Sequence, residues 1–234
     1  DNLATIGGAV FVVSGTLRLE RVHFSLNRAT MGGGSVYSRD SSSIIIGCTF
    51  ENGSTFSFSS FGGGIAFEGG TALIANSKFA RLASGNGGCV TIYEGSFEVS
   101  VEIVDTTFVD CSARSVGGAV TIALWTSVSR FLMTRVSISN CHAAEIGGGI
   151  HIRSVEDAVL TDVTISSTSA DLAGGALACE DFSSSSVSST KVWDLSPVAS
   201  GTSTSSVTMA GSGLSMTSVS AGIGGGLFLC SCTV

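Results

Sequence analysis

The chain has 234 residues, of which 44% are hydrophobic and 12% charged, and its formal net charge is −7. Its length is enough to bury one sizeable core. The 11 basic residues are scattered singly, so we expect no nucleic-acid partner. No apolar run approaches the roughly 20 residues of a transmembrane helix, so we expect no membrane insertion by this segment. The 31 glycines and single proline favour strands and turns over helices.

A glycine pair followed by small and aliphatic residues recurs along the chain. It begins as GGAV at Gly7 and returns with a period of about 27 residues. The third and fifth positions after the first glycine are mostly apolar, an alternation typical of a strand with one buried face. We predict that the pairs form structural corners before these strands: Gly7 and Gly8, Gly33 and Gly34, Gly62 and Gly63, Gly87 and Gly88, Gly117 and Gly118, Gly147 and Gly148, Gly174 and Gly175, and Gly224 and Gly225.

A second pattern precedes each later glycine pair. Two pairs of apolar residues alternate but are offset by one residue, as in Leu17, Leu19, Val22 and Phe24. Both pairs point inward only if the backbone turns a corner between them. Three short strands per unit without a helix describe one coil of a parallel β-helix, whose crossovers are expected to be right-handed.

We therefore predict an all-β fold, a single-stranded right-handed parallel β-helix of about eight coils. Residues 1–234 are expected to form one domain, because the long last interval is explained by a Ser-rich loop insertion at about 180–206. Neither end carries a polar cap over its outermost coil. Repeat proteins need such caps, so we expect the chain to be a segment of a longer protein.

The repeats resemble those of the chlamydial polymorphic membrane proteins, with their GGA[ILV] and Phe-x-x-Asn motifs, and similar repeats in other microbial surface proteins. The glycine motif recurs along the entire chain, whereas Phe-x-x-Asn is matched only from Phe24 to Asn27. The resemblance implies a surface-exposed, adhesin-like rod. The expected architecture is also that of pectin-cleaving enzymes, a pectin-lyase-like solenoid.

No catalytic motif is found. A strand, and not a helix, follows each glycine pair, which argues against a dinucleotide-binding loop, and we expect no cofactor and no metal. Cys111 and Cys141 each lie three residues past the closing apolar residue of consecutive coils. Stacking at ~4.8 Å places them within disulfide range; the alternative is two reduced, buried thiols.

Charged residues are expected on the outside of the coils. Asp105, Arg135 and Asp162 occupy one equivalent outward position in three successive coils, which predicts a charge ladder in which opposite charges stack. His23 and His151 also fall on outward registers and are expected at the surface.

The expected function is that of a non-catalytic, extracellular rod for adhesion or surface display. Its partner would be a host or neighbouring cell-surface macromolecule or glycan. Two loops are candidates for contact: 180–206, with Lys191 and Trp193, and 52–60, with Phe56 and Phe58. Exposed aromatics suggest a contact surface; the alternative is that loop 52–60 folds back and covers the rod or an open coil edge.

Two other functions are kept open. A carbohydrate-active enzyme, a polysaccharide lyase or glycoside hydrolase, would need paired carboxylates, which Asp181 and Asp194 could supply. An ice- or surface-binding protein would need a flat hydroxyl row. Thr91 and Thr121 begin one such row, and Thr107, Ser137, Thr164 and Ser215 form another.

Overall fold

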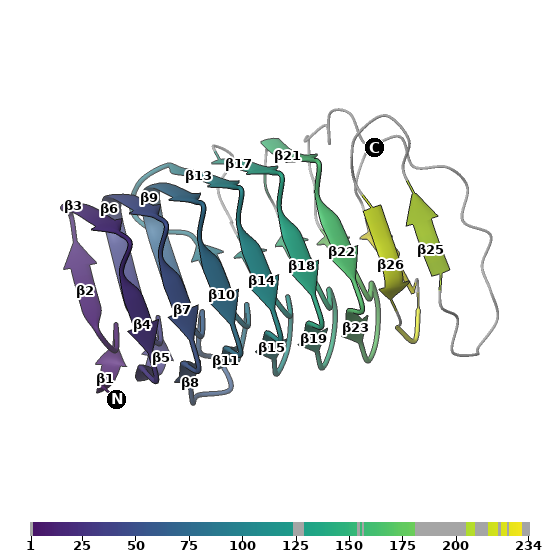
Figure 1. Cartoon of the computed structure of the whole chain (residues 1–234), viewed down its shortest axis with the longest axis horizontal. Helices are drawn as coiled ribbons and strands as arrows, with labels where there is room; N and C mark the ends of the chain where they lie inside the picture. Colours follow the sequence, from purple (N-terminus) through teal and green to yellow (C-terminus); the bar gives the residue numbers. More distant parts are fainter. Residues whose placement is uncertain are drawn as a thin grey trace.

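The computed structural model describes residues 2–123, 129–153, 155, 157–180, 205–208, 215–219, 221–223 and 225–230. These residues form strands and turns only, and the strands stack side by side into a rod (Figure 1). Except for one antiparallel pair, β25 (Ser205–Thr208) with β26 (Ser215–Val219), all strand pairs of the described residues are parallel. The prediction of an all-β, parallel β-helical solenoid is confirmed.

Three sheets run along the rod. The small sheet contains β1 (Leu3–Ile6), β5 (Arg28–Gly32), β8 (Ser54–Thr55), β11 (Ala83–Ser84), β15 (Ser112–Ala113), β19 (His142–Ala143) and β23 (Ser169–Ala170). The second sheet contains β4 (His23–Ser25), β7 (Thr49–Glu51), β10 (Lys78–Ala80), β14 (Thr107–Val109), β18 (Ser137–Ser139), β22 (Thr164–Ser166), β26 (Ser215–Val219) and β25 (Ser205–Thr208).

The large sheet has two arms that meet at a corner. The first arm contains β2 (Val10–Val13), β12 (Val90–Tyr93), β16 (Val120–Ala123), β20 (Ile150–Arg153), β24 (Leu177–Glu180) and β27 (Leu227–Cys230). The second arm contains β3 (Thr16–Glu20), β13 (Val99–Val104), β17 (Ser129–Thr134) and β21 (Asp157–Thr161). The long strands β6 (Val36–Ile46) and β9 (Ile65–Ala75) run through both arms.

The number of turns differs from the expectation of about eight coils. The small sheet contributes one strand per turn, and its seven strands from β1 to β23 enclose six turns. Eight corners bound only seven intervals, and the last of these contains the Ser-rich segment. Of the predicted 180–206 loop, Glu180 belongs to β24, Ser205 and Ser206 belong to β25, and residues 181–204 lie outside the described residues.

The two glycines of a corner have different tasks. Gly117 has φ of +65°, a left-handed backbone conformation that residues with a side chain rarely adopt. A Cβ on Gly118 would lie 2.0 Å from the carbonyl oxygen of Gly148 in the next coil. The first glycine therefore makes the turn and the second allows neighbouring coils to approach. The other pairs from Gly7 to Gly175 take the same places before the first arm, and Gly224 lies outside the described residues.

Two further corners use residues other than glycine in the left-handed region, with φ from +48° to +58°. Short Asn and Asp side chains tolerate this conformation better than most. One corner column contains Arg21, Asn76, Asp105, Arg135 and Asp162, and the other contains Leu26, Asn52, Arg81, Asp110, Asn140 and Ser167.

The core is a set of stacked ladders, because equivalent residues of successive coils lie directly above one another. In the second sheet, Phe24, Phe50, Phe79 and Phe108 stack with ring centroids 4.7–4.9 Å apart. Ile138 and Ile165 continue this column. Such stacks fix the register of each coil on the next.

The corner between the two arms is where chain length varies. The arms are continuous in β6 and β9, but residues 94–98 separate β12 from β13 in the next coil. The residues that follow β16 and β24, 124–128 and 181–204, lie outside the described residues. The rest of each coil keeps its register.

Candidate functional site

The outer face of the first arm is covered by other parts of the chain. Alternate side chains of each strand point outward here, yet Thr91, Thr121 and His151 are only 1%, 2% and 3% exposed. The segments that precede the glycine pairs flank this face and bridge to one another, as Val116 does to Ile146. The prediction of a surface His151 is therefore wrong, and the Thr91 row is not a flat exposed array.

Hydrogen bonds hold these covering segments against the strands. The Thr91 hydroxyl donates to the carbonyl oxygen of Asn86 at 2.6 Å, and the Thr121 hydroxyl donates to that of Val116 at 2.8 Å. The strands of the first arm form the floor of this face, and the covering segments form its wall. These hydrogen bonds thus fix the floor and the wall relative to each other in successive coils.

Between the floor and the wall lies a cavity of about 400 Å³, which we call the hollow. Its lining is Phe61, Asn86, Thr91, Tyr93, Ser115, Val116, Thr121, Ala123, Glu145, Ile146, His151 and Arg153. Tyr93, Ala123 and Arg153 occupy equivalent positions of three neighbouring strands. The small Ala123 therefore leaves a gap between two large side chains, whose Cα atoms are about 10 Å apart, two strand spacings of ~4.8 Å.

One end of the hollow is aromatic. The rings of Phe61 and Tyr93 stack with centroids 4.6 Å apart. The ring of Tyr37 lies edge-on to that of Tyr93, with centroids 6.5 Å apart. The Phe11 ring, in the coil nearer the N terminus, has its centroid 5.6 Å from that of Tyr37. Four aromatic rings from four coils thus form a continuous cluster beside the cavity.

Hydrogen bonds fix the tyrosines of this cluster. The hydroxyl groups of Tyr93 and Tyr37 lie 2.5 Å apart, and the Tyr37 hydroxyl donates to the carboxylate of Glu68, which pairs with Arg39 at 3.3 Å. Burial and the hydrogen bond to Glu68 raise the pKa of Tyr37 to about 12. Burial, followed by the hydrogen bond to Tyr37, raises the pKa of Tyr93 well above its usual range. Both rings are therefore neutral at physiological pH.

The other end of the hollow is polar. The Ser115 hydroxyl donates to the carboxylate of Glu145 at 2.9 Å, and both groups line the cavity beside His151 and Arg153. The hollow thus combines an aromatic end with a wall of hydrogen-bonding groups. The sequence patterns missed this site, because its members alternate with core residues and come from both the strands and the covering segments.

Loop 52–60 presents aromatic side chains, as predicted for a contact loop, with Phe58 68% and Phe56 38% exposed. Arg28 lies over the ring of Phe56, 4.3 Å from its centroid. Arg114 donates to the carbonyl oxygen of Phe56 at 2.6 Å. The Thr55 hydroxyl lies 2.7 Å from that of Ser60. These contacts bind the loop to the rod and leave the Phe58 side chain exposed to solvent. The other predicted contact residues, Lys191 and Trp193, lie outside the described residues.

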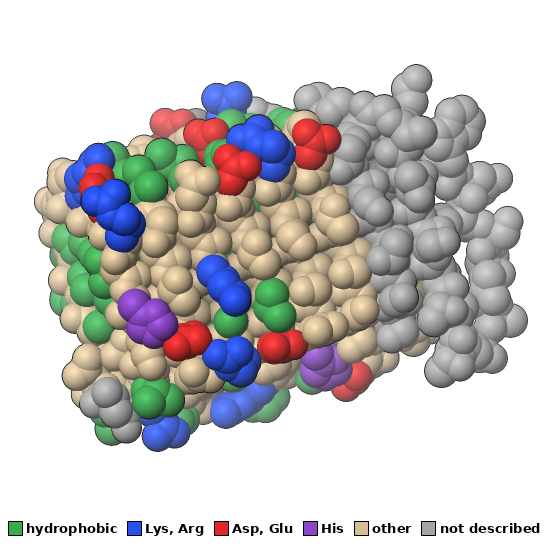
Figure 2. Space-filling view, in the orientation of Figure 1, with side chains coloured by type: hydrophobic (Ala, Val, Ile, Leu, Met, Phe, Trp, Pro, Cys, Tyr) green, Lys and Arg blue, Asp and Glu red, His purple; other side chains and the backbone are tan. Residues whose placement is uncertain are grey.

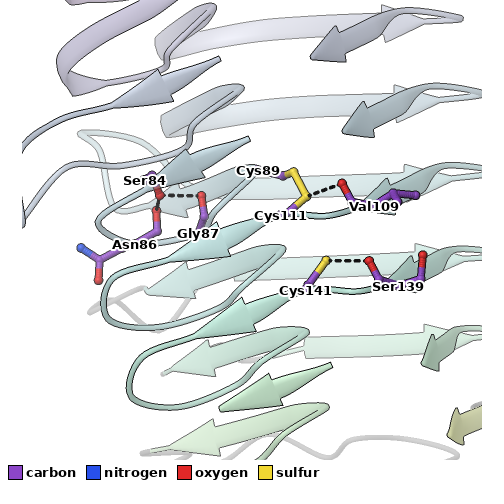
Figure 3. Close-up of a disulfide and its surroundings, with 8 residues drawn as sticks. All are labelled: Ser84, Asn86, Gly87, Cys89, Val109, Cys111, Ser139 and Cys141. Atoms are coloured by element: carbon purple, nitrogen blue, oxygen red, sulfur yellow. Dashed lines mark hydrogen bonds between the residues drawn. A yellow bond between two sulfur atoms is a disulfide. The ribbon is translucent and has the colours of Figure 1, made fainter. Parts of the chain in front are cut away.

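The predicted disulfide has a different partner. Cys111 is bonded to Cys89 of its own coil, with Cα atoms 5.7 Å apart, and Cys141 is a free, buried thiol (Figure 3). The pairing of Cys111 with Cys141 is therefore wrong. Equivalent residues of stacked coils have parallel Cα–Cβ bonds, so their sulfur atoms stay about one strand spacing apart, ~4.8 Å. Cys89 instead lies at the glycine corner, across the coil from Cys111.

The free thiol of Cys141 is held in its protonated, unreactive form. The Cys141 thiol donates to the carbonyl oxygen of Ser139 at 3.2 Å (Figure 3). Burial raises the pKa of Cys141 to about 12, so almost no thiolate is present at neutral pH.

The predicted charge ladder forms in part. The Arg135 guanidinium donates to both carboxylate oxygens of Asp105 at 2.7 and 2.8 Å, and Asp162 occupies the same corner one coil further on. The negative charge of Asp162 attracts the Arg135 guanidinium, but no hydrogen bond joins these two side chains among the described residues. The bond to Arg135 holds the pKa of Asp105 below its usual range. This row lies in solvent and forms an ion pair, not a gathered set of carboxylates.

The second sheet presents a face of a different kind. Thr107, Ser137, Thr164 and Ser215 stand in register on β14, β18, β22 and β26. Figure 2 shows this face, on which charged side chains lie mainly toward the margins. Lys78 interrupts the hydroxyl row on β10.

The described residues contain no group of three His, Cys, Asp or Glu side chains that could hold a metal ion. Asp181 and Asp194, considered above for acid chemistry, lie outside them. The described residues also include no helix that is long and apolar enough to cross a membrane. No protein-family model, curated protein or solved structure matches the chain.

Proposed function

We propose that the protein is a non-catalytic rod for adhesion or display outside the cell, and that it binds a macromolecule on a host or neighbouring cell through loop 52–60. The observation that carries this proposal is the pair Phe56 and Phe58, held exposed on a loop that is hydrogen-bonded to the rod.

The composition of the loop surface supports a protein contact. Aromatic and arginine side chains are enriched among the residues that dominate binding energy at interfaces. Phe56 and Phe58 are flanked by Arg28 and Arg114, which contact the loop. Because its backbone is tied down, little conformational freedom is lost on binding, which favours affinity.

Two further observations support an extracellular, non-catalytic role. The Cys89–Cys111 disulfide is typical of proteins in oxidising compartments. The row of Asp105, Arg135 and Asp162 stands in the open as an ion pair, whereas a polysaccharide lyase or glycosidase needs carboxylates gathered over one groove.

The test is an adhesion assay with beads that carry the purified protein, applied to a panel of mammalian and microbial cells. The Phe56→Ser/Phe58→Ser variant should lose most of the binding of the unchanged protein. Both side chains point outward, so the variant should keep the circular-dichroism spectrum and unfolding midpoint of the rod.

Phe97 provides a matched control, because it is 64% exposed and lies on a different loop. The Phe97→Ser variant should bind as the unchanged protein does. Equal losses in both variants would indicate unspecific hydrophobic adhesion, and undiminished binding by the Phe56→Ser/Phe58→Ser variant would exclude loop 52–60 as the contact.

A further inference from the structure

We propose that the hollow on the first arm is a carbohydrate subsite that accepts one pyranose ring of a glycan between Tyr93 and Arg153. This site uses other side chains than Phe56 and Phe58 and does not depend on the macromolecular partner of loop 52–60.

The size and position of the hollow fit a small ring. Its volume of about 400 Å³ lies within the range of roughly 300–1,000 Å³ that is typical of small-molecule sites. The gap arises because Ala123 separates Tyr93 from Arg153 in the strand register. A larger side chain at this one position would fill the gap, so the hollow depends on the small side chain of Ala123.

The aromatic end matches one property of a sugar. The C–H groups on the face of a pyranose pack against an aromatic ring, which offers a large apolar area with little rotational freedom. Tyr93 is stacked on Phe61 and hydrogen-bonded to Tyr37, so its ring is already ordered before a ligand arrives. A neutral phenol at this place is stable over the physiological pH range.

The polar wall matches the other property, the dense hydroxyl groups around the ring. The Glu145 carboxylate accepts one hydrogen bond from Ser115 and, having two oxygens, can accept others. The Asn86 and His151 side chains line the same cavity. An apolar ligand would offer these polar groups no additional hydrogen bonds, whereas a polyhydroxylated ring supplies further donors and acceptors to them.

A single substitution at Ala123 can fill the hollow. Ala123 is an outward-facing, half-buried residue, so Ala123→Phe fills the hollow without touching the core. Ala75 is also outward-facing and half-buried, but it lies on the second arm. Ala75→Phe therefore adds the same ring to the rod away from the hollow and is the matched control.

The experiment is saturation-transfer NMR of the full chain with millimolar methyl glycosides of glucose, galactose, mannose, N-acetylglucosamine and galacturonic acid. At least one glycoside should receive saturation from the unchanged protein. Ala123→Phe should abolish that transfer and Ala75→Phe should keep it. Tyr93→Ala should weaken binding at least tenfold, whereas Tyr93→Phe, which keeps the ring, should bind within about threefold of the unchanged protein.

Two results would overturn the subsite: no transfer to any of the five glycosides, or equal transfer in Ala123→Phe and the unchanged protein. If Ala123→Phe does not fold, Ala123→Leu takes its place with the same expectation. The Phe56→Ser/Phe58→Ser variant should keep glycoside binding. Glycoside binding without cell adhesion would refute the proposed function alone, and adhesion without glycoside binding would refute the subsite alone.

Discussion

Reduction of the Cys89–Cys111 disulfide should destabilise the rod by an amount that the chain length between the two residues sets. They are separated by 22 residues in sequence, and closing a loop of about 22 residues removes about 3.4 kcal/mol of conformational entropy from the unfolded chain at 25 °C. With a urea slope of about 3 kcal/mol/M, this corresponds to a fall of about 1 M in the unfolding midpoint.

The assay is urea unfolding followed by circular dichroism, with and without dithiothreitol. Cys89→Ala is the preferred variant, because Ala occupies the equivalent corner position at Ala119 and Ala176. The unchanged protein should lose about 1 M in midpoint on reduction, whereas Cys89→Ala should begin at the lower value and show no response to reductant.

Cys141→Ala separates the two pairings that the cysteines allow. Cys141 is a free thiol in the structure, so Cys141→Ala should keep the full response to reductant. A Cys141→Ala protein that no longer responds, together with a Cys89→Ala protein that still does, would refute the Cys89–Cys111 bond and restore the pairing expected from stacking.

Three further outcomes follow from the packing. Phe79 is fully buried between two stacked rings, so Phe79→Ala should cost about 3–5 kcal/mol in urea unfolding. Gly118→Ala should prevent folding or yield an insoluble chain, because the added Cβ would lie 2.0 Å from a carbonyl oxygen of the next coil. Gly15→Ala is the control and should fold, because the nearest atom to its added Cβ is 3.3 Å away. The only two tyrosines are Tyr37 and Tyr93, and burial raises both pKa values. Tyrosinate absorbance should thus be absent at pH 10 in the folded chain and present in urea, and stability should fall as pH rises above 10, since the unfolded chain loses these protons first.

The sequence was most informative about positions that face the core. Inward positions obey a rule that each coil repeats, since a polar or oversized residue there would disturb both neighbouring coils. Phe50 and Phe79 could therefore be assigned to one ladder from spacing alone, and β26 places Met216 in the same column beyond the Ser-rich segment. Stacking also aligned Asp105 with Arg135, whose bidentate pair spans two coils.

The errors share one physical origin, because spacing along the chain says which residues are equivalent in successive coils but not what faces them across a coil. Cys111 and Cys141 are equivalent, and for that reason their side chains run parallel and do not meet. His151 is outward by strand alternation, but the covering segment near Ile146 buries it. Such contacts depend on the path of the chain between strands, which carries no periodic signal.

The same distinction explains where a coil of this rod is free to vary. A corner glycine such as Gly118 is constrained by the next coil, whatever that coil binds. The outward residue at the end of a first-arm strand meets no such constraint, and it changes from Tyr93 to Ala123 to Arg153 over three coils. The backbone therefore continues through the hollow with unchanged hydrogen bonds, and the cavity costs the fold little. This makes Ala123, rather than any glycine or core residue, the position at which a single substitution should remove binding and leave the rod intact.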